Sequence, residues 1–184
     1  ISSPDFLQII SKACQNYSEE LVPENFSSFL RDHIFCDLGN VFVEIYFRDD
    51  SQKTFIPYPF KPAPVTQNFT TNVPTLIPTP KTIFAKLVTD QIYQVYSNDS
   101  DTPSFLLETG NQSHAIFPIP TRNKTTALLY IGCRKNLPFP DEYLQGIQTI
   151  TLLISSWMKN IDVISHLNSS LESLEYSEQL QQAL

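Results

Sequence analysis

Four side chains stand out because they place polar or titratable groups inside otherwise apolar, strand-like runs. Glu44 interrupts the run from Val41 to Phe47, in phase with Tyr46 two positions later. His114 opens a second run, and Tyr130 lies within a third. Because small-molecule sites combine aromatic walls with a few polar groups, we expect these four residues to line a ligand pocket. Glu44 would anchor a ligand cation or donor there, but only if this face of the strand is covered rather than open to solvent.

Patterns that carry catalysis or bind metals do not occur in the sequence. There is no nucleophile elbow, no phosphate-binding glycine loop and no metal-binding triad. No two of the cysteines Cys14, Cys36 and Cys133 lie close enough for a C-x-x-C motif. We therefore expect a chain without catalytic residues, metal or cofactor, with a small-molecule ligand of unknown identity left open.

Charge and cysteine usage bear on partners and location. The 184 residues carry a net charge of −7, and such a surface repels nucleic acid and anionic lipid heads. No stretch has the roughly 18–20 apolar residues of a membrane span. Three sparse cysteines suit a reducing cytosol, so we expect a cytoplasmic domain with no direct membrane insertion. A secreted, glycosylated binding domain stays open as the alternative, because N-x-S/T sequons occur at Asn16, Asn25, Asn68, Asn98, Asn111, Asn123 and Asn168.

Hydrophobic periodicity predicts helices and strands in alternation with one long proline-rich loop. Prolines crowd residues 57–80 and exclude that stretch from helix interiors and central strands. The hairpin of residues 114–120 and 126–134 is the clearest β pattern. The other expected strands are residues 41–47, 55–60 and 92–97. The expected helices are residues 5–13, 23–35, 81–89, 103–108 and 140–184.

The last predicted helix is longer than a compact domain requires. Its apolar residues recur at alternating spacings of three and four, which is typical of a helix that pairs with another helix. We expect residues 1–161 to form the domain and residues 162–184 a coiled-coil linker toward an output domain, with a homodimer formed along the helix. Packing of this helix back on its own domain is the alternative. The predicted dimerisation residues are Ile150, Ile154, Trp157, Ile161, Ile164, Asn168 and Leu171, with Asn168 as a polar register device.

The C-terminal half contains Phe117-Pro118, a polar turn from Thr121 to Lys124, Gly132, Phe139, and Asp141-Glu142 before a long apolar helix. In this order of residues and elements it resembles a GAF domain. This resemblance implies an α+β (α/β sandwich) fold, with a GAF-like antiparallel sheet flanked by N-terminal helices and a long C-terminal signalling helix. PAS domains share this sensory architecture and are the nearest alternative. The resemblance also implies a sensory module that binds a small molecule or dimerises. Residues 170–184 resemble the linker into a two-component sensor histidine kinase.

Particular ligands of GAF domains are only weakly indicated. Asn123-Lys124, Phe139 and Asp141-Glu142 resemble a cyclic-nucleotide signature, but the spacing after Phe139 is shorter here. Asp141-Glu142 is also explained as the acidic first turn of a helix. Cys36 and Cys133 lack a neighbouring basic group that would make a reactive thiolate for a bilin. A ligand-free structural dimerisation module is therefore the second interpretation.

Overall fold

The computed structural model describes residues 23–36, 41–49, 54–57, 77–78, 86–87, 90–121, 124–135, 139 and 141–182, together with Gln8, Ser11 and Gln15. Gln8 and Ser11 are helical, as expected, and the rest of the helix predicted over residues 5–13 lies outside the described part. No helix in the described residues combines the length and apolarity needed to cross a membrane.

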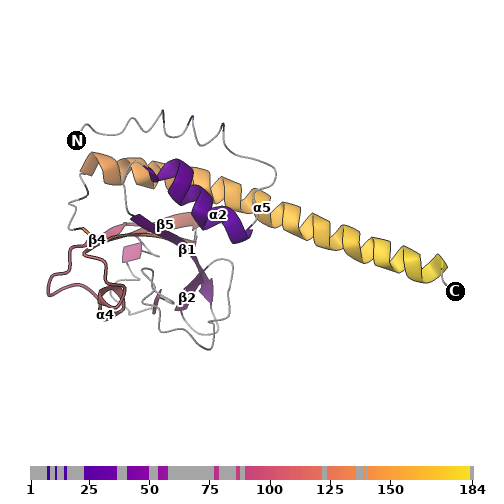
Figure 1. The fold of residues 1–184 in the computed structure, drawn as a ribbon, viewed down its shortest axis with the longest axis horizontal. Coiled ribbons are helices and arrows are strands. Elements are labelled where there is room, and N and C mark those ends of the chain that lie inside the picture. Colours follow the sequence, from indigo (N-terminus) through magenta and orange to yellow (C-terminus); the bar gives the residue numbers. More distant parts are fainter. Residues whose placement is uncertain are drawn as a thin grey trace.

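Six antiparallel strands form one sheet in the order β3-β2-β1-β6-β5-β4, with helices on both sides (Figure 1). The strands are β1 (Val41–Asp49), β2 (Thr54–Pro57), β3 (Ile77–Pro78), β4 (Gln94–Tyr96), β5 (Ser113–Thr121) and β6 (Lys124–Cys133). The helices are α2 (Pro23–Phe29), the π-helical segment η1 (Leu30–Ile34), α4 (Ser104–Leu107) and α5 (Asp141–Gln182). The α+β class expected from the sequence is confirmed. We call the two sides of the sheet the α5-side face, which α2 and η1 also cover, and the α4-side face.

The predicted hairpin forms two adjacent strands, β5 and β6, and β6 is one of the two central strands of the sheet. β5 pairs with β6 from Ser113 to Thr121, with an irregularity between Ile119 and Pro120, and β6 pairs with β1 on its other side. A proline is tolerated in a strand only where its missing N–H faces away from the paired neighbour. Because β5 pairs with β6 through Pro118 and Pro120, their nitrogens face the outer edge of β5. Described pairing between β4 and that outer edge covers only residues 114–116.

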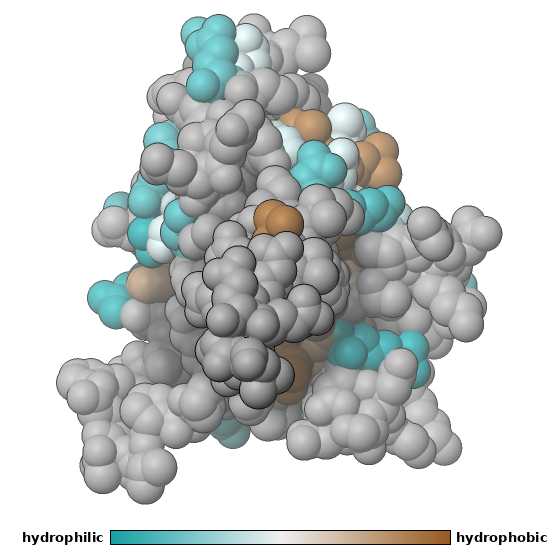
Figure 2. Space-filling model, turned by 90° about the vertical axis from the view of Figure 1, so that its right-hand side faces the viewer, coloured by the Kyte–Doolittle hydropathy of each residue, from teal (hydrophilic) through white to brown (hydrophobic). Residues whose placement is uncertain are grey.

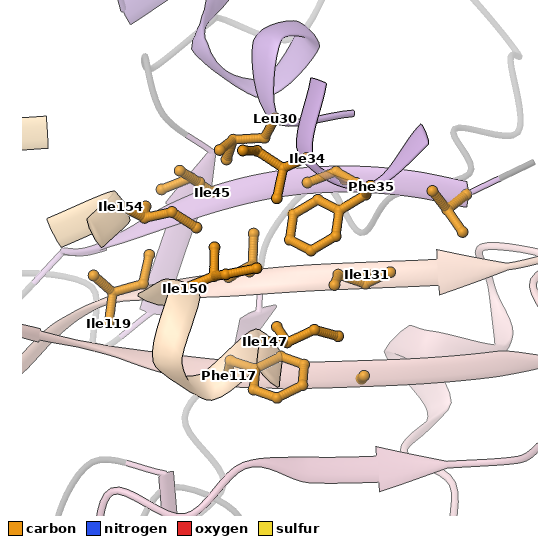
Figure 3. Packing of buried hydrophobic residues seen from close by; sticks show 14 of the residues in the cluster. Leu30, Ile34, Phe35, Ile45, Phe117, Ile119, Ile131, Ile147, Ile150 and Ile154 are labelled. Carbon is orange, nitrogen blue, oxygen red and sulfur yellow. The ribbon is translucent and has the colours of Figure 1, made fainter. Parts of the chain in front are cut away.

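Apolar side chains of the sheet, of α2 with η1, and of α5 meet on the α5-side face. Alternate residues of β5 and β6 point there, as the period of two of a strand requires. Phe29 of α2 and Trp157 of α5 meet edge to face with ring centroids 5.6 Å apart. The side chains shown in Figure 3 are Leu30, Ile34, Phe35, Ile45, Phe117, Ile119, Ile131, Ile147, Ile150 and Ile154. This apolar contact holds the helices to the sheet.

Helix α5 follows the prediction in its length and continuity. It runs unbroken for 42 residues, which corresponds to about 63 Å, and its second half extends beyond the sheet (Figure 1). Ile150, Ile154 and Trp157 are at most 6% exposed, and all three belong to the core of the single chain. Leu171 is 57% exposed. The dimerisation role of these residues, and the division at residue 161, stay predictions.

Shorter predicted elements are found with changed limits. The expected strand over residues 92–97 is limited to β4, and the strand over residues 55–60 ends, in the described part, at Pro57. Of the helix expected over residues 81–89, only Lys86 and Leu87 are described, and both are helical. Most of the proline-rich stretch lies outside the described residues. Its two described residues after Pro57, Ile77 and Pro78, form the edge strand β3, where a proline is tolerated.

Candidate functional site

A closed ring of hydrogen bonds lies on the α4-side face. Asn111 Nδ2 donates to Tyr130 Oη at 2.9 Å, and Tyr130 Oη lies 3.0 Å from His114 Nδ1. His114 Nε2 lies 2.9 Å from Asn98 Oδ1, and Asn98 Nδ2 donates to the backbone carbonyl of Asn111 at 2.7 Å. We call these four residues the polar ring. It joins the loops on either side of α4 to the strands β5 and β6.

The ring determines which imidazole nitrogen of His114 carries the proton. The backbone carbonyl of Asn111 can only accept, so the amide nitrogen of Asn98 must face it and the amide oxygen must face His114. Nε2 of His114 therefore donates to Asn98, and Nδ1 accepts the hydroxyl proton of Tyr130. Tyr130 Oη in turn accepts from Asn111. These bonds suit a neutral imidazole that carries its proton on Nε2.

Burial favours this neutral state. His114 is fully buried, and removal of the imidazole from water lowers its pKa to about 4. Burial likewise raises the pKa of Tyr130, although the hydrogen bond from Asn111 acts in the opposite direction. The ring therefore contains no charge at neutral pH.

Gly132 makes room for the ring. It lies two residues after Tyr130 on β6, so both residues face the α4 side. A Cβ atom at Gly132 would overlap Asn111 Nδ2 and Tyr130 Oη. The glycine is therefore required because two polar groups occupy the space that any other side chain would need.

The structure buries Tyr46, His114 and Tyr130 on the α4-side face, whereas the Glu44 carboxylate is held by α2, which covers the opposite face. Glu44 faces Tyr130 directly across the β1–β6 pairing, and Tyr46 follows two positions later on the same strand. Glu44 Oε1 accepts from Ser27 Oγ at 2.6 Å, so its carboxylate is bound to α2. Tyr46 is fully buried, and burial together with the nearby carboxylate of Glu44 raises its pKa. A ligand-lining role for these residues stays a prediction.

Asn98 and Asn111 were recognised in the sequence only as sequons, and their part in the ring was missed. Asn111 follows Gly110, which has a φ of 71°, and Asn98 itself has a φ of 49°. Asparagine is common in turns and next to turn glycines. It therefore indicates a turn, but it does not reveal a hydrogen-bond partner more than ten residues away. Asn111 is fully buried, so the fold leaves no room for a glycan on its amide.

The cyclic-nucleotide-like residues are not gathered at the ring. Phe139 packs against the α5-side core, where its ring stacks on Tyr143 with centroids 6.5 Å apart. Asp141 is exposed at the start of α5, as a helix-capping acid would be. Asn123 lies outside the described residues, and so do the side chains of Lys124 and Glu142.

The cysteines also lie away from the ring. Cys133 is buried in the α5-side core, and Cys36 is exposed just after η1. Cys14 lies outside the described residues. Among the described residues, no three His, Cys, Asp or Glu side chains gather as metal ligands would.

A second site is an open groove of about 400 Å³ between α5 and the outer edge of β5. None of its lining residues is charged. Side-chain amides and hydroxyls alternate with apolar groups along its walls, and Leu152 at its rim is 61% exposed. The lining residues are Gln91, Pro118, Pro120, Gln145, Gln148, Thr149, Thr151 and Leu152.

Comparison with solved structures identifies the fold. No family model matches the sequence, and no curated protein matches it either. The GAF domain of an Acinetobacter phosphoenolpyruvate-protein phosphotransferase matches 89% of this chain and 99% of its own, with a TM-score of 0.63 and 10% identity. The reduced form of fRMsr of Staphylococcus aureus matches 85% of this chain and 96% of its own, with a TM-score of 0.58 and 20% identity.

A phycocyanobilin-bound GAF domain from a cyanobacterial phytochrome matches 88% of this chain and 95% of its own, with a TM-score of 0.56 and 14% identity. At such identities the likeness concerns the fold alone. The chain has a GAF-like fold, and this part of the resemblance seen in the sequence is confirmed.

Proposed function

We propose that this chain is a sensory or regulatory domain that receives a signal on the α4-side face and passes it along α5. The supporting observation is that α5 forms part of the core and then continues as the same helix beyond the sheet. His114 belongs to β5, and Ser155 of α5 donates to the carbonyl of Pro120 on that strand at 2.7 Å. A shift of β5 at the polar ring would therefore reach α5 through direct contacts.

Helix α5 also suggests how the chain assembles and where its signal goes. We propose a cytoplasmic homodimer whose helix leads to an output domain, with a histidine kinase as the first candidate. The linker-like residues 170–184 and the GAF-like fold support this choice. Expression of a longer chain, followed by an autophosphorylation assay, tests the histidine kinase output. An output domain of another kind would overturn this choice.

Ligand screening tests the sensory role. A compound that binds at the polar ring is expected to raise the melting temperature of the wild-type chain and of Tyr93→Phe, but to stabilise Tyr130→Phe less. Tyr93 is the matched control because its ring packs on Phe117 on the opposite face, with centroids 5.3 Å apart. If no cyclic nucleotide, metabolite or tetrapyrrole stabilises the wild-type chain, the ligand-sensing part of the proposal fails.

A ligand-free dimerisation module is the second candidate, and one observation favours it. Tyr46, Phe55 and Tyr130 are each fully buried on the α4-side face, where they pack with Leu106 of α4. The protein's own side chains thus occupy this part of the face. Under this interpretation the polar ring is purely structural, and dimerisation persists without any small molecule.

A reductase role is suggested by the likeness to fRMsr, a free methionine-R-sulfoxide reductase, but it has less support. Reduction of a sulfoxide to a sulfide needs two electrons, which two thiols supply as they form a disulfide and release water. The two described cysteines lie outside the polar ring, as reported above. We therefore propose a non-catalytic domain, and incubation with free methionine-R-sulfoxide and a thiol reductant is expected to leave the sulfoxide unchanged.

A further inference from the structure

Helix α5 carries a second stripe on the side opposite the core. Within the domain this stripe consists of Thr149, Leu152, Ser156 and Asn160, all of which are exposed. Leu152, at 61%, is the most exposed of the large hydrophobic side chains of the described residues. The predicted dimerisation residues in the same part of the helix instead face the sheet and are buried. A helix packed against this half of α5 would therefore meet the second stripe.

The stripe continues in register beyond the sheet. Val163, Leu167, Ser170 and Leu174 follow at helical spacing, and the average step from residue 149 to residue 174 is about 3.6 residues, the period of a straight helix. We call the eight positions the outer stripe. Three of its four members near the domain are small or polar, and three of its four members in the extended part are apolar. The outer stripe therefore stays on one side of α5 along both halves of the helix.

Charge makes this stripe suitable for contact between copies. Each chain carries a net charge of −7, so two chains repel one another over most of their surfaces. The outer stripe contains no acidic residue. Asp162 and Glu172, the acids of α5 between residues 149 and 174, occupy register positions off the stripe. Viewed from the end at which α5 leaves the domain, the coloured surface shows only small, separate apolar patches among hydrophilic residues (Figure 2).

The groove beside Leu152 adds a self-complementary surface. Gln91, Gln145 and Gln148 line it, and a glutamine amide both donates and accepts hydrogen bonds. A two-fold contact places the same patch on both partners, so it suits groups that can pair with their own copies. No charge has to be removed from water when a second chain covers this groove.

We propose that a second copy of this chain packs its α5 in parallel against the outer stripe, with Leu152 at the centre of the contact within the domain. The proposal rests on the proposed homodimer and assigns its interface. Because the two domains then lie on the outer sides of the helix pair, each keeps its own core contacts. A parallel pair formed along Ile150, Ile154 and Trp157 would place both domains in the space between the helices.

Sedimentation of the 184-residue chain over a range of concentrations tests this assignment. Leu152→Glu is expected to weaken self-association by about tenfold or more, because it buries a carboxylate in the contact. Leu171→Glu is the matched control, since Leu171 is also an exposed leucine of α5 but lies off the outer stripe. It is expected to leave the dimer unchanged. Thermal unfolding of both variants checks that the fold is kept.

Other results of the sedimentation experiment would refute either the homodimer or its assignment to the outer stripe. A wild-type chain that stays monomeric would refute the proposed homodimer itself. A dimer that survives Leu152→Glu but is lost in Leu171→Glu, or that is lost in both variants, would refute the outer stripe while leaving dimerisation in place. Ser156→Cys provides a second readout, because residues on a parallel two-fold seam lie near their own copies. In a background without the three native cysteines, a disulfide between the two copies of this cysteine is expected, and its absence counts against the proposal.

Discussion

The described side chains of the α5-side face are mostly aliphatic or aromatic, whereas the buried side chains of the α4-side face include His114, Asn111 and Thr109. Apolar contacts on the first face depend on area and shape but have no direction. The polar ring on the second face depends on direction, because each of its hydrogen bonds joins a donor to an acceptor. We therefore expect the α5-side face to tolerate repacking better than the part of the α4-side face that holds the polar ring.

The largest expected effect comes from removing area on the α5-side face. Phe117→Ala deletes a fully buried ring and is expected to lower the free energy of unfolding by about 3–5 kcal/mol in urea denaturation. Phe105→Ala, the same change at a half-buried position of α4, should cost less than half as much. Equal losses would mean that the two faces contribute similarly to stability.

Filling the space at Gly132 is the corresponding change on the α4-side face. Gly132→Ala is expected to cost about 2–3 kcal/mol, because Asn111 and Tyr130 must move and the ring opens. Gly110→Ala is the control: its φ of 71° is unfavourable for alanine, but nothing lies near the added methyl group, so about 1 kcal/mol is expected. A smaller loss at Gly132 than at Gly110 would show that the ring yields easily.

Acid should weaken the α4-side face selectively. The pKa of His114 is about 4 in the folded chain and near 6.5 when unfolded, so the unfolded state binds more protons between these values. The stabilisation is complete above pH 6.5 and is lost as the pH falls toward 4. Between pH 7.5 and pH 5 the free energy of unfolding should fall by about 1–2 kcal/mol.

Histidine variants assign this pH dependence to one residue. His114→Gln is expected to remove most of the change between pH 7.5 and pH 5, while His33→Gln, in η1 and outside the ring, should keep it. Urea denaturation at both pH values measures the difference. The same pH dependence in both variants would show that the acid effect arises elsewhere.

The smallest expected effect concerns the link from the sheet to α5. Ser155→Ala removes the hydrogen bond to the Pro120 carbonyl and is expected to cost about 1 kcal/mol. Ser173→Ala, at an exposed position of the same helix outside the outer stripe, should stay within about 0.5 kcal/mol of the wild type. If the two variants behave alike, this hydrogen bond contributes nothing measurable to the attachment of α5.

The contrast between the faces also explains what could be predicted from the sequence. The hairpin, η1 and α5 were predictable because apolar residues recur with the period of a strand or a helix. His114 and Tyr130 were recognised because they place titratable groups in strand-like apolar runs. Asn98 and Asn111 were not, because a hydrogen-bond partner across a sheet leaves no periodic trace and both residues suit ordinary turns.

The position of α5 could be predicted only in part. Its apolar spacing indicated a contact with another helix, but residues that pack on a sheet and residues that pair with a partner helix have the same spacing. The structure separates these cases for Ile150, Ile154 and Trp157, which fill the core. Which side of α5 is exposed depends on where the sheet lies, and the spacing of apolar residues does not contain that information.

The two prolines of β5 also have a consequence for the behaviour of the chain at high concentration. Beyond the residues paired with β4, the outer edge of β5 carries Pro118 and Pro120, whose nitrogens face outward without a hydrogen. A strand from another molecule can extend a sheet only where donors alternate with acceptors. This rim offers no backbone donor at Pro118 or Pro120, and the Pro120 carbonyl already accepts from Ser155, so the rim resists the edge-to-edge growth that leads exposed sheets into fibrils.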